Sequence, residues 1–145
     1  MYQRILVPLE HGPADETIVG HVRRLAKQCG PPPAEVVLLH VADGWVARNI
    51  KELDLRESEE MREDRAYLER LCAELRQDGL EADAVLAAGD PAKEIAAAAE
   101  REGCDLIAMA THGHRLLEDV VRGSTATALR HLTRIPVLMV RADKP

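Results

Sequence analysis

The chain has 145 residues, and its 25 Asp and Glu against 19 Lys and Arg give a formal net charge of −6. One domain spanning residues 1–145 is expected at this length, and it is long enough to bury an ordinary core. Only 2% of the residues are aromatic and phenylalanine is absent, so the core must be aliphatic. Nucleic-acid binders rely on basic surfaces and stacking rings, so an acidic chain with few rings argues against that class of partner. A small anionic ligand is not excluded, because a local site can oppose the global charge.

The three cysteines, Cys29, Cys72 and Cys104, lie far apart and form no Cys-x-x-Cys pair. This usage indicates a reducing compartment in which the thiols serve as small apolar residues. No signal-like stretch opens the sequence, and no apolar run approaches the roughly 20 residues that cross a bilayer. We therefore expect a cytoplasmic protein with no membrane partner.

The hydrophobic pattern alternates between short apolar runs and amphipathic stretches, which predicts strands that alternate with helices. The predicted elements, in chain order, are a strand at 5–7, a helix at about 13–29, a strand at 36–41, a helix at about 55–78, a strand at 84–88, a helix at 91–102, a strand at 106–110, a helix at about 125–133 and a strand at 136–140. The mixed-sign charges at 57–65 are interpreted as a solvated helix face.

Local signals mark the ends of two of these helices. Pro13 suits a first helical turn, and Gly30 with the prolines after it ends that helix. Asp90 is a favourable N-cap and Pro91 a favourable first residue, while Gly103 can cap the other end.

The alternation predicts an α/β fold, a doubly wound parallel sheet of five strands with helices on both faces. Such sheets bind ligands beyond the carboxyl ends of the strands, where the strand order reverses. The reversal lies beside the first strand, so the loop at residues 8–12 is expected to face the loop at residues 111–114. This geometry predicts a binding site before any motif is considered.

Glycines in the second half of the chain suggest how that site holds a ligand. Gly113 follows a strand, where bare backbone can approach a ligand closely. Gly123 and Ser124 stand where a helix begins, and the free N–H groups there favour an anion such as phosphate, with a hydroxyl added by Ser124 or Thr125. The alternative is a glycine turn followed by a serine N-cap. Neither a P-loop nor a Gly-x-Gly-x-x-Gly motif is present.

At these residues the sequence resembles the universal stress protein family. Nucleotide-binding members carry Gly-x-x-Gly, nine residues and then Gly-Ser/Thr; here residues 110–113 read Ala-Thr-His-Gly, and nine residues separate them from Gly123-Ser124. The resemblance covers the whole chain and includes the segments 4–9, 38–41, 89–91 and 135–140.

The resemblance implies the strand order 3-2-1-4-5, a homodimer built by pairing the last strands from Val137 to Val140, and ATP binding, with ADP or AMP as related ligands. Carried over by position, Glu10 meets the ribose and the backbone of Val41 meets adenine. Around the phosphates it implies Gly113, His114, Gly123, Ser124 and Thr125. The expected nucleotide-binding set is completed by Pro8, Leu9, Met109, Ala110, His112 and Arg115.

The sequence departs from the family pattern at two positions. Ala110 replaces the first glycine of the motif. Its methyl group is tolerable if that position has strand-like dihedrals, but it costs about 1–3 kcal/mol if the position needs a positive φ or lies against the ribose. Glu10 replaces an aspartate and adds one methylene group. Both changes affect nucleotide affinity rather than the fold.

Three further features have two interpretations each. His112 and His114 could bind a metal with Glu10 or His11, or they are polar residues of a phosphate-side loop. His40, at the end of an apolar strand, is interpreted as a buried histidine with satisfied hydrogen bonds. Trp45 and Arg48 form either a lid over adenine or a half-exposed loop.

The leading interpretation is a cytoplasmic stress-response dimer that binds an adenine nucleotide, with Mg²⁺ where phosphates need it. One alternative is an interaction protein of the same fold that works without nucleotide. Another is a slow ATP hydrolase in which Glu10 or His112 positions water. The sequence shows no arginine finger and no carboxylate pair for a metal, so slow or absent turnover is expected.

Overall fold

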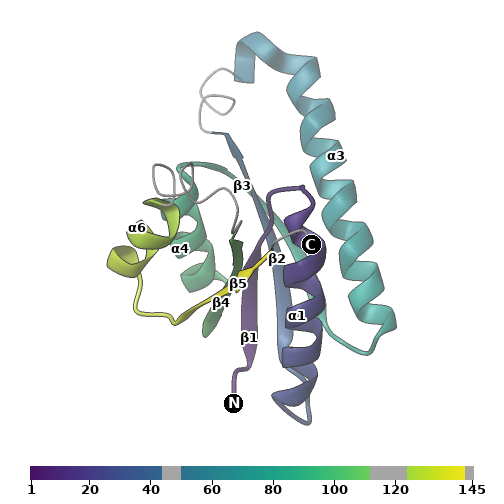
Figure 1. Cartoon of the computed structure of the whole chain (residues 1–145). Helices are drawn as coiled ribbons and strands as arrows, with labels where there is room; N and C mark the ends of the chain where they lie inside the picture. Colours follow the sequence, from purple (N-terminus) through teal and green to yellow (C-terminus); the bar gives the residue numbers. More distant parts are fainter. Residues whose placement is uncertain (44–49, 112–123, 143–145) are drawn as a thin grey trace.

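A parallel sheet of five strands forms the centre of the protein (Figure 1). The computed structural model describes residues 1–43, 50–111 and 124–142. All pairings are parallel and the strand order is β3-β2-β1-β4-β5, as the sequence and its resemblance predicted. The strands are β1 (Arg4–Pro8), β2 (Glu35–Asp43), β3 (Ala82–Gly89), β4 (Leu106–Thr111) and β5 (Val137–Arg141).

Helices cover both faces of this sheet (Figure 1). α1 (Ala14–Gln28) and α3 (Ile50–Gln77) pack on one face, and α4 (Pro91–Arg101) and α6 (Ser124–Leu132) lie on the other. Because successive strand residues point to opposite faces, β1 and β2 contribute to two aliphatic cores. Fully buried residues of the α1/α3 face include Ile5, Val7, Leu38 and Leu68, and those of the α4/α6 face include Leu6, Leu39, Ile107 and Leu129.

The predicted helix ends are confirmed at α4. The Asp90 side chain accepts a hydrogen bond from the Lys93 N–H at 3.1 Å, Pro91 opens the helix, and Gly103 adopts a φ of +69° just after it. At α1, Pro13 is the N-cap residue and has helical dihedrals. The largest difference in bounds is at α3, which begins at Ile50 rather than near residue 55. Its first turns extend past the edge of the sheet (Figure 1).

The cysteines behave as small apolar residues. All three are free; Cys72 and Cys104 are buried and Cys29 is partly exposed. Burial raises the pKa of both buried thiols to about 11. None of the described helices is long and apolar enough to cross a membrane.

Candidate functional site

The β1–α1 loop (residues 9–12) lies at the carboxyl edge of the sheet, where the strand order reverses. β1 pairs with β2 on one side and with β4 on the other, and Leu6 lies opposite Ile107. The carboxyl ends of β1 and β4 therefore meet at the same edge, as predicted for a ligand site in this fold. Leu9 is buried in the loop, whereas the side chain of Glu10 is exposed.

Asp15, in the first turn of α1, fixes the backbone of this loop. Its side chain is only 3% exposed. Oδ1 accepts a hydrogen bond from the Glu10 N–H at 3.2 Å, and Oδ2 accepts from the N–H groups of His11 at 3.0 Å and Gly12 at 3.2 Å. The Tyr67 hydroxyl of α3 donates to the same Oδ2 at 2.7 Å. A carboxylate at a helix N-terminus also interacts favourably with the helix dipole.

A second carboxylate, Asp64 of α3, joins the loop to β2 through two histidines. His11 Nδ1 lies 2.7 Å from Asp64 Oδ1, and His40 Nε2 lies 3.3 Å from Asp64 Oδ2. His40 Nδ1 lies 2.9 Å from the carbonyl oxygen of Leu9. The His11 ring stacks on Tyr67 with ring centroids 3.9 Å apart. We call His11, His40 and Asp64 the histidine–aspartate cluster.

The predicted nucleotide-binding residues that the structure describes lie on both faces of the same edge. Leu9 and Ala110 pack against the α1/α3 core, and Val41 and Met109 against the α4/α6 core. Pro8 ends β1, Ser124 opens α6, and Thr125 is half-buried in its first turn. The other predicted positions lie outside the described residues: His112, Gly113, His114, Arg115, Gly123, and the Trp45 and Arg48 of the suggested lid.

Ala110 does not need the backbone that only glycine adopts freely. It lies in β4 opposite Val140. Among the described residues, His11 is the only one other than glycine with a positive φ, at 62°. The methyl group at position 110 therefore adds no backbone strain, and the cost considered for this departure can arise only from contact with the ribose.

Comparison with known proteins now decides the family. The sequence matches the universal stress protein family over residues 1–141. The chain belongs to the universal stress protein family. Universal stress protein MJ0577 of Methanocaldococcus jannaschii is 29% identical to it, with 97% of this chain and 96% of that protein covered.

Solved structures agree with this assignment. The MJ0577 structure superimposes with a TM-score of 0.80 at 28% identity and covers 100% of this chain and 99% of its own. Two more distant structures share the fold. One is a universal stress protein in complex with cAMP, with a TM-score of 0.66, 14% identity and 96% of each chain covered. The other is the Archaeoglobus fulgidus protein in complex with dAMP, with a TM-score of 0.61, 19% identity and 96% and 98% covered.

In this universal stress protein, three residues at the loop were not predicted from the sequence: Asp15, Asp64 and Tyr67. The charged run at 57–65 was interpreted as a solvated face, which is wrong for Asp64, whose side chain is 19% exposed and contacts both histidines. Asp64 and Tyr67 are three residues apart, so they share one face of the helix. This spacing was the sequence signal that Asp64 lies beside an aromatic side chain. His40 was predicted to be a buried histidine with satisfied hydrogen bonds. It does contact Leu9 and Asp64, but its side chain is 15% exposed rather than fully buried.

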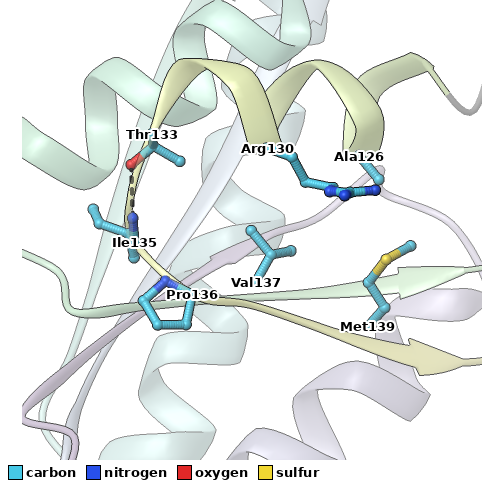
Figure 2. A pocket seen from close by; sticks show the side chains of 7 residues that line it. All are labelled: Ala126, Arg130, Thr133, Ile135, Pro136, Val137 and Met139. Carbon is cyan, nitrogen blue, oxygen red and sulfur yellow. Dashed lines mark hydrogen bonds between the residues drawn. The ribbon is translucent and has the colours of Figure 1, made fainter.

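Two hollows within the described part of this universal stress protein are lined by none of the predicted nucleotide residues. One, of about 360 Å³, lies between α6 and β5 and is shown in Figure 2, with Arg130 and Met139 on its rim. The other, of about 530 Å³, lies between α1 and α3 beside Asp15 and Tyr67. Among the residues that the structure describes, no group of three or more His, Cys, Asp or Glu side chains is arranged to hold a metal ion. The His112 and His114 pair lies outside those residues.

Proposed function

We propose that this universal stress protein is a cytoplasmic stress-response module that binds ATP or a related adenine nucleotide at the carboxyl edge of β1 and β4. The observation that carries the proposal is the ordered β1–α1 loop. Asp15 fixes three consecutive backbone N–H groups of this loop, so the exposed Glu10 carboxylate is presented at the reversal of strand order. A carboxylate there can accept hydrogen bonds from ribose hydroxyl groups.

The start of α6 supports a phosphate position. The first turn of α6 contains no acidic residue, whereas α1 has Asp15 and Glu16 and α4 has Glu94 in theirs. The free N–H groups and dipole of α6 are therefore not neutralised by a carboxylate of its own first turn. With Gly113, Gly123 and Ser124, this helix would hold the phosphates, and Mg²⁺ would supply charge neutralisation where ATP is bound. The relatives whose structures are described with cAMP and dAMP make an adenine nucleotide the fitting ligand class.

Calorimetry with ATP, ADP and AMP tests this proposal directly. Gly123→Val is expected to weaken binding by at least about ten-fold, because a side chain would block the close approach of phosphate. Glu10→Gln is expected to weaken it by about three-fold through the ribose. Glu16→Gln, in the first turn of α1, is the matched control and should bind like the wild type. Failure of all three nucleotides to bind at millimolar concentration would refute the proposal.

The same variant separates the proposal from its alternatives. A nucleotide-independent interaction protein would keep its dimerisation and stress tolerance in Gly123→Val while nucleotide affinity falls. Phosphate release measured with ATP in the same samples addresses hydrolysis. We expect a rate of phosphate release close to that of the buffer alone, because the sequence shows no arginine finger and no carboxylate pair for a metal.

We also propose that two copies pair through β5, from Val137 to Val140. β5 is the edge strand of the sheet, and among the described strands it pairs with β4 alone. An unpaired edge presents N–H and C=O groups to a second strand. Met139, in the middle of β5, is 50% exposed, and Leu132 of the neighbouring α6 is 47% exposed. An antiparallel pair centred on Met139 would cover this apolar surface with its own copy.

A further inference from the structure

The contacts of the histidine–aspartate cluster determine which ring nitrogens of His40 must carry a proton. A carbonyl oxygen only accepts, so the contact of 2.9 Å to Leu9 requires a proton on Nδ1 of His40. An ionised carboxylate also only accepts, so a proton on His40 Nε2 is required for its contact of 3.3 Å with Asp64 to be favourable. His40 therefore needs both protons, and hence a positive charge, to satisfy both contacts.

The neutral form of His40 breaks one of these contacts. If Nδ1 keeps its proton for Leu9, the lone pair of Nε2 faces the lone pairs of Asp64 Oδ2. If Nε2 takes the proton instead, the lone pair of Nδ1 faces the Leu9 carbonyl oxygen. His11 differs, because one proton on its Nδ1 satisfies the 2.7 Å contact with Asp64 Oδ1 in either charge state. Loss of a proton therefore breaks a contact mainly at His40.

The cluster sits between elements that carry the proposed nucleotide site. His40 lies in β2 directly before Val41. It contacts the carbonyl oxygen of Leu9, the residue directly before Glu10. Asp64 belongs to α3, which runs alongside α1 (Figure 1). His40 and Asp64 are 15% and 19% exposed, so water screens their interaction only in part.

The other charged and titratable groups around the cluster are few among the described contacts. Asp15 of α1 is occupied by the loop N–H groups and by Tyr67, and burial together with the Asp15 contact raises the pKa of the Tyr67 phenol. Arg70 lies 5.5 Å from the centre of the Tyr67 ring, on the same helix. From β3, the residue paired with His40 is Leu86, which does not titrate. The exposed Glu10 is next to His11 in the chain.

We propose that the histidine–aspartate cluster is a proton-operated latch that regulates the nucleotide site. While His40 is charged, it ties the Leu9 carbonyl to Asp64 and holds the β1–α1 loop against α3. When His40 loses its proton, one of the two ties is lost and the loop is held less firmly. Histidine is the side chain whose charge ordinarily changes between about pH 5 and pH 8, so affinity for nucleotide falls as the pH rises through that range. This regulation rests on the proposed function, because the loop carries Glu10.

Asp64→Asn is the decisive variant because it reverses the requirement for a proton. The amide oxygen of Asn can accept from His11 Nδ1, and the amide NH₂ can donate to the bare Nε2 of neutral His40. The variant therefore holds the loop without a charge on His40. A merely structural role for Asp64 would instead weaken the protein at every pH.

The experiment measures AMP affinity by calorimetry at about pH 6 and about pH 8 in EDTA for four proteins. These are the wild type, Asp64→Asn, His40→Gln and the control His21→Gln, whose histidine lies on α1 outside the cluster. The phosphate of AMP itself titrates near pH 6, but this effect is common to all four and cancels in the ratios. We expect the wild type and His21→Gln to lose about five-fold more affinity on raising the pH than Asp64→Asn and His40→Gln.

Ring ¹⁵N spectra of the ligand-free protein provide an independent readout. They should show His40 charged at about pH 6 in the wild type and neutral, with the proton on Nδ1, at about pH 8. A neutral His40 at the lower pH, or equal pH ratios for the wild type and Asp64→Asn, would overturn the latch. A pH dependence that appears only when Zn²⁺ replaces EDTA would also overturn it, in favour of a metal site. If AMP does not bind at any pH, the proposed function fails while the spectra still decide the latch.

Discussion

Removal of the Asp15 carboxylate tests whether one side chain organises the β1–α1 loop. In Asp15→Ala, three backbone N–H groups and the Tyr67 hydroxyl lose their acceptor. A hydrogen bond to a charged group contributes about 1.5 kcal/mol or more. Two effects reduce the total: water can reach the exposed loop, and the variant no longer desolvates a carboxylate. We expect the free energy of unfolding to fall by about 2–3 kcal/mol.

Two further variants make the estimate specific. In Asp15→Asn the amide oxygen can take the place of Oδ2 and keep three partners, while the NH₂ group then faces the Glu10 N–H, so a loss of about 1–2 kcal/mol is expected. A phenol is protonated at neutral pH, and burial and the Asp15 contact raise the pKa of Tyr67 further, so its hydroxyl remains a donor. A double-mutant cycle of Asp15→Ala with Tyr67→Phe should give a coupling energy of about 1 kcal/mol.

Urea unfolding followed by circular dichroism measures these losses at a fixed protein concentration, because dimerisation would add to apparent stability. Glu16→Ala removes an exposed carboxylate from the same helical turn and should change stability by less than about 0.5 kcal/mol. Hydrogen exchange should show faster exchange at the amides of Glu10, His11 and Gly12 in Asp15→Ala under native conditions. A loss as small as that of the control, or unchanged exchange at these amides, would refute the assigned role.

Three other predictions concern separate features. Ala110→Gly should lower stability by about 0.5–1 kcal/mol without raising nucleotide affinity more than about three-fold, because the strand backbone already accepts a methyl group; a larger gain in calorimetry would contradict this. Iodoacetamide at pH 8 should modify Cys29 alone in the native protein, since Cys72 and Cys104 are buried with pKa values of about 11; mass spectrometry showing the buried thiols modified first would oppose it. Met139→Cys in a Cys29→Ser background should form a disulfide-linked dimer on mild oxidation if β5 pairs about this residue, and a purely monomeric product would count against that pairing.

The fold followed from local patterns because each strand carries its own signal. The run from Val36 to Val41 is apolar on both faces apart from His40, which predicts a strand covered on both sides, and Asp90 with Pro91 predicts a helix start. The start of α3 was less predictable, because its first turns extend past the sheet, which leaves the sheet pattern without a signal for where the helix begins. Charged residues there favour a helix but do not mark where it begins.

The candidate site could be predicted in position but not in its internal contacts. The reversal of strand order predicts the loop after β1 from topology alone. The contacts that hold this loop join residues far apart in the chain: Asp15 with Tyr67 across 52 positions, and His11 with Asp64 across 53. Helical periodicity predicts which residues of α3 share a face, but not which loop that face meets. Asp64 was therefore assigned to the solvent together with its charged neighbours.

The acidic charge of the chain and a nucleotide ligand are compatible because the described carboxylates at this edge already have partners. Asp15 accepts bonds from N–H groups and from Tyr67, and Asp64 lies against two histidines. Their charge is partly compensated before a ligand arrives, whereas α6 begins without an acidic residue in its first turn. No acidic residue of its own first turn therefore opposes a phosphate at α6, the position proposed for that group, although the chain has a net charge of −6. Under the proposed latch, loss of the His40 proton would remove part of that compensation, so the same residues that order the loop would also make its electrostatics depend on protons.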